Sequence, residues 1–494
     1  MPPYQLSKQA QRDFELILEY TYHCIIFTIL TTILFSCQST PTPSQQSPNV
    51  IIIFTDDQGY QDVGCFGAPD IKTPHLDKMA KQGIRLTNFY AAQAVCSASR
   101  AALLTGCYPN RLGVHGAYMP NSKKGLNLEE TTIAEMLKEQ GYQTAIFGKW
   151  HLGDHPDFMP NRQGFDEYFG IPYSNDMWPM HPQQGPIFDF DPLPLYENET
   201  IIDTLTDQSL LTVQITERSI DFIAKHKDQP FFLYMAHPQP HVPLFVSKKF
   251  RGKSDRGLYG DVIMEIDWSV GQIIATLEQY DIHQNTLLIF TSDNGPWLSY
   301  GHHAGSAHPL REGKGTAWEG GQREPCIIYY PNKLEPNRTI TTPMMNIDIL
   351  PTIASLTNAQ LPKHPIDGKN VWDIWTGASN KSPHEAYFFY YHVNELHGVR
   401  YKNWKLYFPH TYRTLNGRVG RKDGIPIDYE YHSVEQIELY NLDEDVGETQ
   451  NVAAKYPEVV TKIKGLADEM RGQLGDALTK VEGRGNRSAG VVSE

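Results

Sequence analysis

The sequence predicts an α/β fold, in which a large mixed, mostly parallel sheet is sandwiched by helices and followed by a smaller α+β C-terminal subdomain with a short antiparallel sheet. Continuous apolar, β-branched runs recur along the chain, as is typical of strands buried on both faces of a parallel sheet. Stretches with helix-spaced apolar residues lie between these runs, and this alternation favours a helix-covered parallel sheet. After about residue 380 the runs become shorter and richer in tyrosine and phenylalanine, which indicates a change of architecture.

The composition excludes several classes of protein. The chain has 494 residues, of which 40% are hydrophobic, so it is globular and long enough for a large α/β domain. The formal net charge of −14 argues against a nucleic-acid partner. A polyanionic substrate would therefore need a locally basic site within an acidic protein.

The first 37 residues have the character of a leader. Residues 24–35 form an apolar run that is too short for an ordinary transmembrane helix but suits the core of a signal peptide. Leu-Phe-Ser-Cys at 34–37 resembles a bacterial lipobox, which predicts export to the periplasm and a membrane anchor on lipidated Cys37. Residues 38–48 are rich in Pro, Ser and Gln, and we expect them to be a linker.

The catalytic domain is expected over residues 49–380. Four runs predict buried strands: 49–55, 144–147, 231–235 and 286–291. Helical patterns cover residues 97–104, 132–140, 205–226 and 259–280. Thr132 and Glu135 form a capping-box pattern at the start of the second of these helices, and Gly141 marks its end.

A C-terminal subdomain is expected over residues 381–482. Short strands are predicted at 386–391, 398–401, 404–408 and 438–440, and a closing helix at 456–470. Residues 483–494 form a polar tail. The few cysteines do not form a disulfide framework; one bridge is possible, and its pairing stays open.

Polar side chains follow each of the four predicted strands. In chain order they are Asp56 and Asp57, Lys149 and His151, His241, and Asp293 and Asn294. Because ligand sites in open α/β sheets form beyond the carboxyl ends of the strands, we expect these residues to converge. An extended stretch at 149–151 would direct Lys149 and His151 to the same side.

Four of these residues carry oxygen donors. Asp56, Asp57, Asp293 and Asn294 suit a hard cation, Ca²⁺ first and Mg²⁺ second. The alternative is that each pair forms an Asx turn that closes a buried strand.

Cys96 stands at the start of a helix-favouring run. A helix N-terminus offers free N–H groups and the positive end of a dipole, which suits an oxyanion such as sulfate. Arg100 comes four residues later and should face the same side as Cys96. The alternative is a buried cysteine beside a surface arginine.

Longer patterns around these residues resemble the type I sulfatases. Residues 96–106 match the signature C-x-[PA]-x-R followed by Thr-Gly, and residues 141–151 match G-Y-x-T-x-x-x-G-K-x-H. Residues 314–325 match K-G-x-x-x-E-G-G-x-R-E-P, and 241–243 match H-x-P. Leu-Tyr-Asn-Leu-Asp-Glu-Asp at 439–445 is similar to the family's C-terminal subdomain. The resemblance implies an alkaline-phosphatase-like fold.

The resemblance also implies a mechanism. A maturation enzyme would oxidise Cys96 to formylglycine, whose hydrate attacks the sulfur of a sulfate ester. One Ca²⁺ would be held by Asp56, Asp57, Asp293, Asn294 and residue 96. Arg100, Lys149 and Lys314 would hold the reacting oxygens, His241 would protonate the leaving alcohol, and His151 would help to expel sulfate.

The expected substrate is a sulfated polysaccharide or its oligosaccharides. We expect a marine algal glycan such as ulvan or carrageenan first and a glycosaminoglycan second. Polar and aromatic residues in loops near the predicted mouth are candidates for sugar binding, although they could equally pack the loops: Asn175, Asp176, Trp178, Trp297, His302, His303 and His308. Two alternatives stay open, a phosphatase or phosphonate hydrolase on the same fold and, if Cys96 is not modified, a non-catalytic binder of sulfated glycans.

Overall fold

The computed structural model describes residues 3–35, 47–182 and 189–492. Residues 1–46 and 47–494 form two separate compact units. The N-terminal unit contains one helix, α1 (Lys8–Phe35). No helix in the described ranges is both long enough and apolar enough to cross a membrane. The predicted lipidation site Cys37 and the predicted linker residues 38–46 lie outside the described residues.

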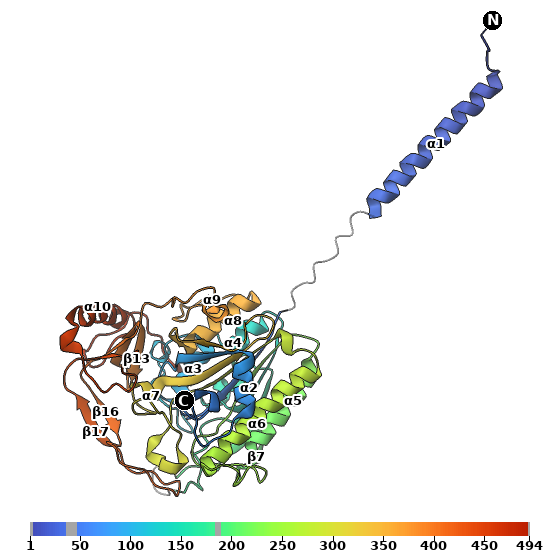
Figure 1. Cartoon of the computed structure of the whole chain (residues 1–494). Helices are drawn as coiled ribbons and strands as arrows, with labels where there is room; N and C mark the ends of the chain where they lie inside the picture. Colours follow the sequence, from blue (N-terminus) through green and yellow to red (C-terminus); the bar gives the residue numbers. More distant parts are fainter. Residues whose placement is uncertain (1–2, 36–46, 183–188, 493–494) are drawn as a thin grey trace. The chain divides into compact units, whose positions relative to one another are not determined.

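The second unit is built on one large sheet (Figure 1). Its strand order is β11 (Arg338–Ile340), β2 (Ile84–Tyr90), β10 (Arg323–Tyr329), β9 (Thr286–Ser292), β1 (Asn49–Thr55), β8 (Phe231–Ala236), β4 (Gln143–Lys149), β5 (Glu167–Ile171), β6 (Pro194–Glu197) and β7 (Thr200–Thr204), with β12 (Met344–Met345) beside β2. The centre, from β9 to β5, is parallel, and antiparallel pairs flank it on both sides. The predicted mixed, mostly parallel sheet is confirmed.

Helices cover both faces of this sheet because its central strands are apolar on both sides. Val50, Ile52 and Phe54 of β1 enter one hydrophobic core, and Ile51 and Ile53 enter the other. The first core includes residues of α3 (Cys96–Thr105), α4 (Ile133–Lys138), α8 (Ile349–Thr357) and α9 (Trp372–Thr376). The second core includes residues of α2 (Pro74–Gln82), α5 (Leu211–His226) and α6 (Leu258–Gln279), which lie together in Figure 1.

The four predicted strands are β1, β4, β8 and β9. The capping box is also present, since Glu135 accepts from the Thr132 N–H at 2.8 Å and Thr132 Oγ1 accepts from the Glu135 N–H at 3.1 Å. The helix predicted from residue 205 begins instead at Leu211. Asp207 accepts hydrogen bonds from Ser209 in a local turn, which competes with helix formation before that point.

Sequence patterns did not predict β10, which lies between β2 and β9 and runs antiparallel to both. The strand starts with Arg323, Glu324 and Pro325, residue types that are uncommon in buried strands. Its pairing with β2 shifts register between Glu324 and Cys326, around the proline that cannot donate a hydrogen bond.

The C-terminal subdomain is α+β, as predicted. Its antiparallel sheet has the order β13 (Tyr387–Tyr391), β14 (Glu395–Tyr401), β15 (Trp404–Tyr407) and β18 (Glu438–Asn441), and α10 (Pro457–Leu474) packs on it. A separate hairpin consists of β16 (His410–Thr414) and β17 (Glu430–Val434). Near the C-terminus, β19 (Gly490–Val491) pairs with β3 (Lys124–Gly125), and Arg487 forms an ion pair with Glu130 at 2.6 Å.

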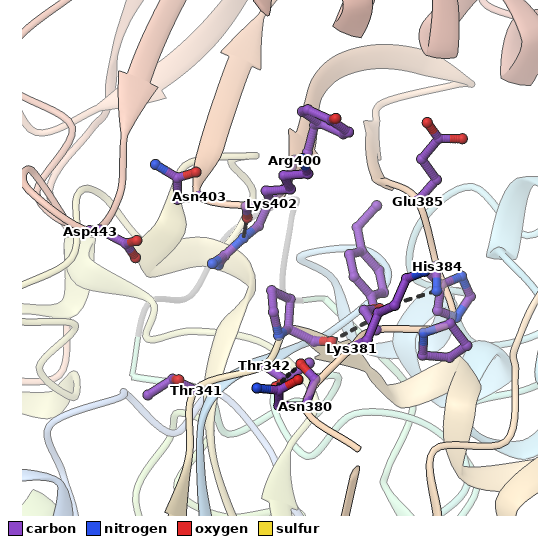
Figure 2. Close-up of a pocket in the computed structure, with 15 residues that line it drawn as sticks. Thr341, Thr342, Asn380, Lys381, His384, Glu385, Arg400, Lys402, Asn403 and Asp443 are labelled. Carbon is purple, nitrogen blue, oxygen red and sulfur yellow. Dashed lines mark hydrogen bonds between the residues drawn. The ribbon is translucent and has the colours of Figure 1, made fainter. Parts of the chain in front are cut away.

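A buried ion pair joins the subdomain to the large sheet. Lys405 on β15 contacts Glu319 of the short helix α7 (Glu319–Gln322) at 2.7 Å, and both side chains are fully buried. Arg323 reaches the same carboxylate at 3.2 Å. A cavity of about 860 Å³ lies along this junction, between residues 341–343 and 380–385 and the turn from β14 to β15 (Figure 2).

Two glycine substitutions test how closely the central strands approach one another. Gly148 of β4 has φ +122°, and a Cβ there would lie 1.9 Å from the Ala236 carbonyl oxygen of β8. We expect Gly148→Ala to lower the free energy of unfolding by about 3 kcal/mol or more, through strain and overpacking. The same substitution at Gly465 of α10 meets no atom within 4 Å and should raise that free energy by about 0.5–1 kcal/mol. Urea unfolding measures both, and equal stability of the two variants would contradict the expectation.

Candidate active site

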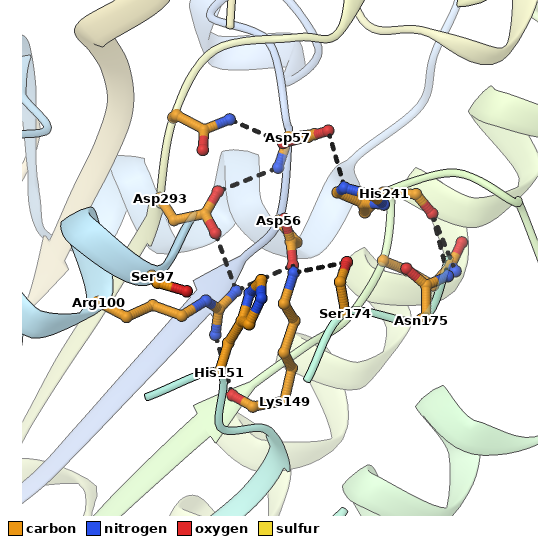
Figure 3. A network of polar contacts seen from close by, with 12 residues as sticks. Asp56, Asp57, Ser97, Arg100, Lys149, His151, Ser174, Asn175, His241 and Asp293 are labelled. Atoms are coloured by element: carbon orange, nitrogen blue, oxygen red, sulfur yellow. Dashed lines mark hydrogen bonds and ion pairs between the residues drawn. The ribbon is translucent and has the colours of Figure 1, made fainter. Parts of the chain in front are cut away.

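The strand-end residues converge at one edge of the sheet (Figure 3). β9, β1, β8 and β4 are consecutive, parallel neighbours, so their carboxyl ends lie side by side. The residues that follow or end them are Asp56 and Asp57 (β1), Lys149 (β4), His241 (β8), and Asp293 and Asn294 (β9). Convergence at this edge was expected from the sequence, and the structure brings all six together.

Three carboxylates lie buried at this edge. Asp56 and Asp293 have no exposed surface, and Asp57 is 3% exposed. The Asp57 N–H donates to Asp293 Oδ1 at 3.1 Å, and Asn294 Nδ2 donates to Asp57 Oδ1 at 2.7 Å. Removing several carboxylates from water in one place is costly unless cations compensate for their charge.

Arg100 supplies the first of these cations. It lies one turn beyond Cys96 on α3, and its side chain has no exposed surface. Its Nη2 contacts Asp56 Oδ2 at 3.1 Å and Asp293 Oδ2 at 3.0 Å, while Nη1 donates to the Lys149 carbonyl oxygen at 3.1 Å. One guanidinium therefore links the ends of three strands.

Two lysines supply the other cations. Lys149 forms a buried ion pair with Asp56 and donates to Ser174 Oγ at 3.0 Å. Lys314 contacts Asp57 Oδ1 at 2.6 Å. Three carboxylates are thus matched by three cations within one buried cluster.

The charges of the cluster lower the pKa of Asp56, whereas the pKa of Asp293 is raised. Burial alone would raise the pKa of Asp56, but Lys149, His241 and Arg100 lower it well below the usual range. Burial and the neighbouring charge of Asp56 raise the pKa of Asp293 to about 7. A second cation beside Asp293 would favour its ionised form.

The oxygens of the site fit a hard cation. Within the described part of the chain, Asp56 Oδ1, Asp57 Oδ2 and Asn294 Oδ1 are buried and have no hydrogen-bond donor. Ligand atoms of Asp56, Asp57 and His241 also lie within 4.8 Å of one another. The oxygens of Asp293 are occupied by Arg100 and by the Asp57 N–H. Since Ca²⁺ and Mg²⁺ prefer oxygen donors, the three unsatisfied oxygens point to a metal of that class.

Cys96 is the first residue of α3 and lines a cavity of about 260 Å³ beside this cluster. Its side chain is 2% exposed, and burial raises the pKa of the thiol to about 11. The free thiol is therefore protonated at neutral pH and is a weak nucleophile in this form.

Two histidines face the same cavity. His241 Nε2 lies 3.5 Å from Asp57 Oδ2, and its Nδ1 lies 2.6 Å from the Val242 carbonyl oxygen. His151 Nε2 lies 2.9 Å from the Tyr118 carbonyl oxygen, and burial, reinforced by Lys149, lowers the pKa of His151 well below its usual value.

The backbone at His151 differs from the extended stretch that we expected. His151 has φ 60°, so the chain turns sharply after β4, yet Lys149 and His151 both reach the site. Asp57 turns in the same way after β1, with φ 63°. Left-handed backbone at residues other than glycine stores strain and is common at functional sites.

The candidate sugar-binding residues separate into two groups. Asp176 and Trp297 line the cavity at Cys96. The Asn175 amide instead donates to the Pro243 carbonyl oxygen at 3.1 Å, and the buried Trp178 indole donates to the Leu205 carbonyl oxygen at 2.8 Å. His302, His303 and His308 are not in the lining of this cavity.

Sequence reasoning missed Ser174 and Arg413, which also line the cavity. Ser174 follows β5, so the strand-end rule that selected Lys149 would have found it. Arg413 comes from the β16–β17 hairpin, and no local pattern connects it with Cys96. Among the other described cysteines, Cys65, Cys107 and Cys326 form no disulfide.

Family models match most of the chain. The model of the sulfatase family matches residues 48–359, and the model of the C-terminal region of aryl-sulfatase matches residues 382–487. The C-terminal model of N-sulphoglucosamine sulphohydrolase matches residues 313–416.

Individual relatives span nearly the whole chain. Human arylsulfatase A is 37% identical over 459 residues, which cover 87% of this chain and 89% of that protein. An N-acetylgalactosamine-6-O-sulfatase of Bacteroides thetaiotaomicron is 33% identical over 495 residues, covering 87% and 94%. The crystal structure of Ps i-CgsB in complex with k-i-k-neocarrahexaose has a TM-score of 0.70 and 29% identity, covering 86% of this chain and 93% of that one.

Removing the Arg100 guanidinium should destabilise the protein strongly. Arg100→Gln leaves Asp56 and Asp293 buried without that cation, and we expect the free energy of unfolding to fall by about 3–5 kcal/mol. Arg418→Gln is the matched control, because Arg418 forms an exposed ion pair with Glu430, worth about 0–1 kcal/mol. Urea unfolding in excess EDTA measures both variants. Equal losses would show that the buried cluster does not depend on Arg100.

Proposed function

The chain belongs to the sulfatase family and is a sulfuric ester hydrolase, and from that premise we propose that its substrates are sulfated polysaccharides or their oligosaccharides. The observation that carries the proposal is the cavity at Cys96, which Lys314 of the buried charge cluster lines together with His151 and His241 and whose walls are partly aromatic. The neocarrahexaose complex of one relative supports a marine algal glycan such as ulvan or carrageenan. The name of the Bacteroides relative supports an amino-sugar glycan as second candidate.

The active site would be completed by a formylglycine at position 96 and a calcium ion. A maturation enzyme, which supplies the oxidant, would oxidise Cys96 to formylglycine with loss of the sulfur as sulfide, and this replaces a protonated, weakly nucleophilic thiol by an aldehyde that hydrates to a diol. Asp56, Asp57, Asp293, Asn294 and residue 96 would hold one Ca²⁺. When bound, the ion supplies Lewis-acid polarisation of the sulfate.

The cations of the chain hold the developing charge. Arg100, Lys149 and Lys314 are fixed by the buried carboxylates before substrate arrives, so they need little reorganisation during the reaction. Ser174 holds the Lys149 ammonium from the other side. These groups stabilise negative charge on the sulfate oxygens and orient the nucleophile at residue 96.

The two histidines move protons. His241 lies at the cavity beside Trp297 and donates a proton to the leaving alcohol from Nε2. Its Nδ1–H is held by the Val242 carbonyl oxygen. Burial keeps His151 neutral at physiological pH, so it can accept a proton from the hydroxyl at residue 96 when sulfate leaves.

We also propose that the protein is exported to the periplasm and anchored through lipidated Cys37. The apolar run at 24–35 and the lipobox-like residues 34–37 support this location. It would place the catalytic unit where extracellular oligosaccharides arrive.

Mass spectrometry of the Cys96 peptide tests the proposed nucleophile. We expect an aldehyde in place of the thiol in protein made together with a formylglycine-generating enzyme, and sulfate release from 4-nitrophenyl sulfate that exceeds phosphate release from 4-nitrophenyl phosphate. Cys96→Ser should lose steady-state turnover, because a serine sulfate ester has no second hydroxyl to expel the sulfate. An unmodified thiol in fully active protein, or sustained turnover by Cys96→Ser, would rule out the formylglycine mechanism.

Calcium should stabilise the folded protein. At a hundredfold excess over the dissociation constant, Ca²⁺ should add about 2.7 kcal/mol to the free energy of unfolding and raise Tm above its value in EDTA. Asn294→Ala removes an oxygen that has no donor in the structure and should reduce the shift. The expectation fails if Tm is the same in Ca²⁺ and EDTA, or if Asn294→Ala responds as the wild type does.

A further inference from the structure

The cavity at Cys96 is small. Its volume of about 260 Å³ is below the ~300–1,000 Å³ of pockets for drug-sized ligands, so it suits one sugar ring with its sulfate group. Four of the residues proposed to take part in the reaction line the cavity, namely Cys96, His151, His241 and Lys314. Apart from Ser174, which holds Lys149, the remaining lining has no part in the proposed chemistry at sulfur; it belongs to loops, to Tyr391 at the end of β13 and to Arg413 on the β16–β17 hairpin.

Trp297 is the aromatic wall next to the reacting groups. The centroid of the Trp297 ring lies 5.5 Å from the centroid of the His241 ring and 4.7 Å from the Lys314 ammonium. A ring that contacts both places an apolar surface beside the leaving alcohol. A sugar that bears the sulfate would therefore lie against Trp297.

Asp176 is a carboxylate without a donor. Its side chain is 7% exposed and lines the cavity, and its Oδ1 accepts no hydrogen bond from any residue that the structure describes. Asp176 also has no ion pair with a cation among those residues. A buried acceptor without a partner is costly, and a ligand that donates a hydroxyl would remove this cost.

Arg413 is a cation without an ion pair to a carboxylate, although its charge acts on Glu312 nearby. Its Nε donates to the Lys314 carbonyl oxygen at 3.0 Å, Nη2 contacts the same oxygen, and its Cζ lies 4.6 Å from the Tyr429 ring centroid. Over the described ranges no carboxylate forms an ion pair with it, and residues 183–188, outside those ranges, include no acidic residue. Arg100, Lys149 and Lys314, by contrast, all have carboxylate partners.

We propose that Asp176 and Arg413 select the substrate: a single sulfated sugar residue that donates a hydroxyl to Asp176 and carries a second oxyanion, sulfate or carboxylate, against Arg413. The inference rests on the proposed glycan sulfatase function and names its substrate class. The ring lies on Trp297, and the sulfate to be cleaved lies at residue 96.

Matched substrates test this selection. The first set tests whether the second anion is a sulfate, and it consists of N-acetylgalactosamine 4-sulfate, 6-sulfate and 4,6-disulfate. The second set tests whether the second anion is a carboxylate, and it consists of glucose 2-sulfate and glucuronic acid 2-sulfate. We expect kcat/KM for the better dianionic sugar to exceed that of its monoanionic counterpart about tenfold or more, the effect of one charge-assisted hydrogen bond. 4-Nitrophenyl sulfate, which has neither hydroxyl nor second anion, reports the chemistry at sulfur.

Variants assign the selection to the two residues. Arg413→Gln keeps a donor for the Lys314 carbonyl oxygen but should lower the ratio of dianionic to monoanionic kcat/KM about tenfold, and Arg413→Lys should restore part of it. Asp176→Asn should lower the ratio of kcat/KM for the sugar to kcat/KM for 4-nitrophenyl sulfate about tenfold or more, mainly through a higher KM for the sugar. Arg418→Gln on the same hairpin and Asp203→Asn on β7 lie outside the cavity lining and should keep the wild-type ratios.

Four results would overturn the inference; the first three leave the glycan sulfatase proposal in place, and the fourth removes both. Equal wild-type rates on monoanionic and dianionic sugars, or ratios that Asp176→Asn and Arg413→Gln leave unchanged, would refute the selection alone. An Arg413→Gln loss that is equal for all substrates would assign that residue to holding Lys314 only. Hydrolysis of 4-nitrophenyl sulfate without hydrolysis of any of these sugars or of carrageenan and ulvan oligosaccharides would remove the proposed glycan substrate and the inference together.

Discussion

The buried carboxylates at the ends of β1 and β9 are the constraint on which the rest of the site depends. Asp56, Asp57 and Asp293 have almost no exposed surface, and their mutual repulsion would be unfavourable without positive charge nearby. The chain therefore brings one cation from α3, one from β4 and one from the glycine-rich segment that begins at Lys314. That segment can approach so closely because Gly295 has no side chain: a Cβ there would lie 1.9 Å from the Gly320 carbonyl oxygen. The orphan oxygens of the same cluster then define where a further cation belongs.

The rigid sheet allows strain at its edge. β1 pairs with β9 along its whole length and with β8 over most of it, and all three strands are buried. Just beyond such strands Asp57 and His151 adopt left-handed backbone, which costs about 1–3 kcal/mol at each residue. The turns direct the Asp57 and His151 side chains into the site instead of along the strand direction. A flexible loop would relax to an unstrained conformation, so the position of these groups depends on the pairing of strands beneath them.

The central sheet and the convergence of polar residues at its edge could be predicted from the sequence because both have local signals. β1 and β9 are uninterrupted apolar runs, and Asp56 and Asp293 follow them directly. β10 had no such signal, since its opening residues Arg323 and Glu324 are charged and buried by long-range packing. The left-handed turn at His151 was also missed. Sequence periodicity predicts helices and strands, but it does not predict the backbone conformation of a residue that follows a strand. Arg413 shows the limit most clearly: only the fold brings a hairpin residue 317 positions after Cys96 to the same cavity.

Lys314 connects the buried carboxylate cluster with Arg413 in the cavity lining. Its ammonium belongs to the carboxylate cluster at Asp57, while its carbonyl oxygen accepts hydrogen bonds from Arg413, whose guanidinium also lines the cavity. The hairpin that carries Arg413 thereby holds the backbone of a residue whose ammonium contacts the buried carboxylates. Gly315 makes this contact possible, because a Cβ there would lie 2.4 Å from the Arg413 guanidinium. Lys405 and Glu319 form a separate buried ion pair between the C-terminal subdomain and the large sheet, so the subdomain that carries the hairpin is positioned by more than the contact between Arg413 and Lys314.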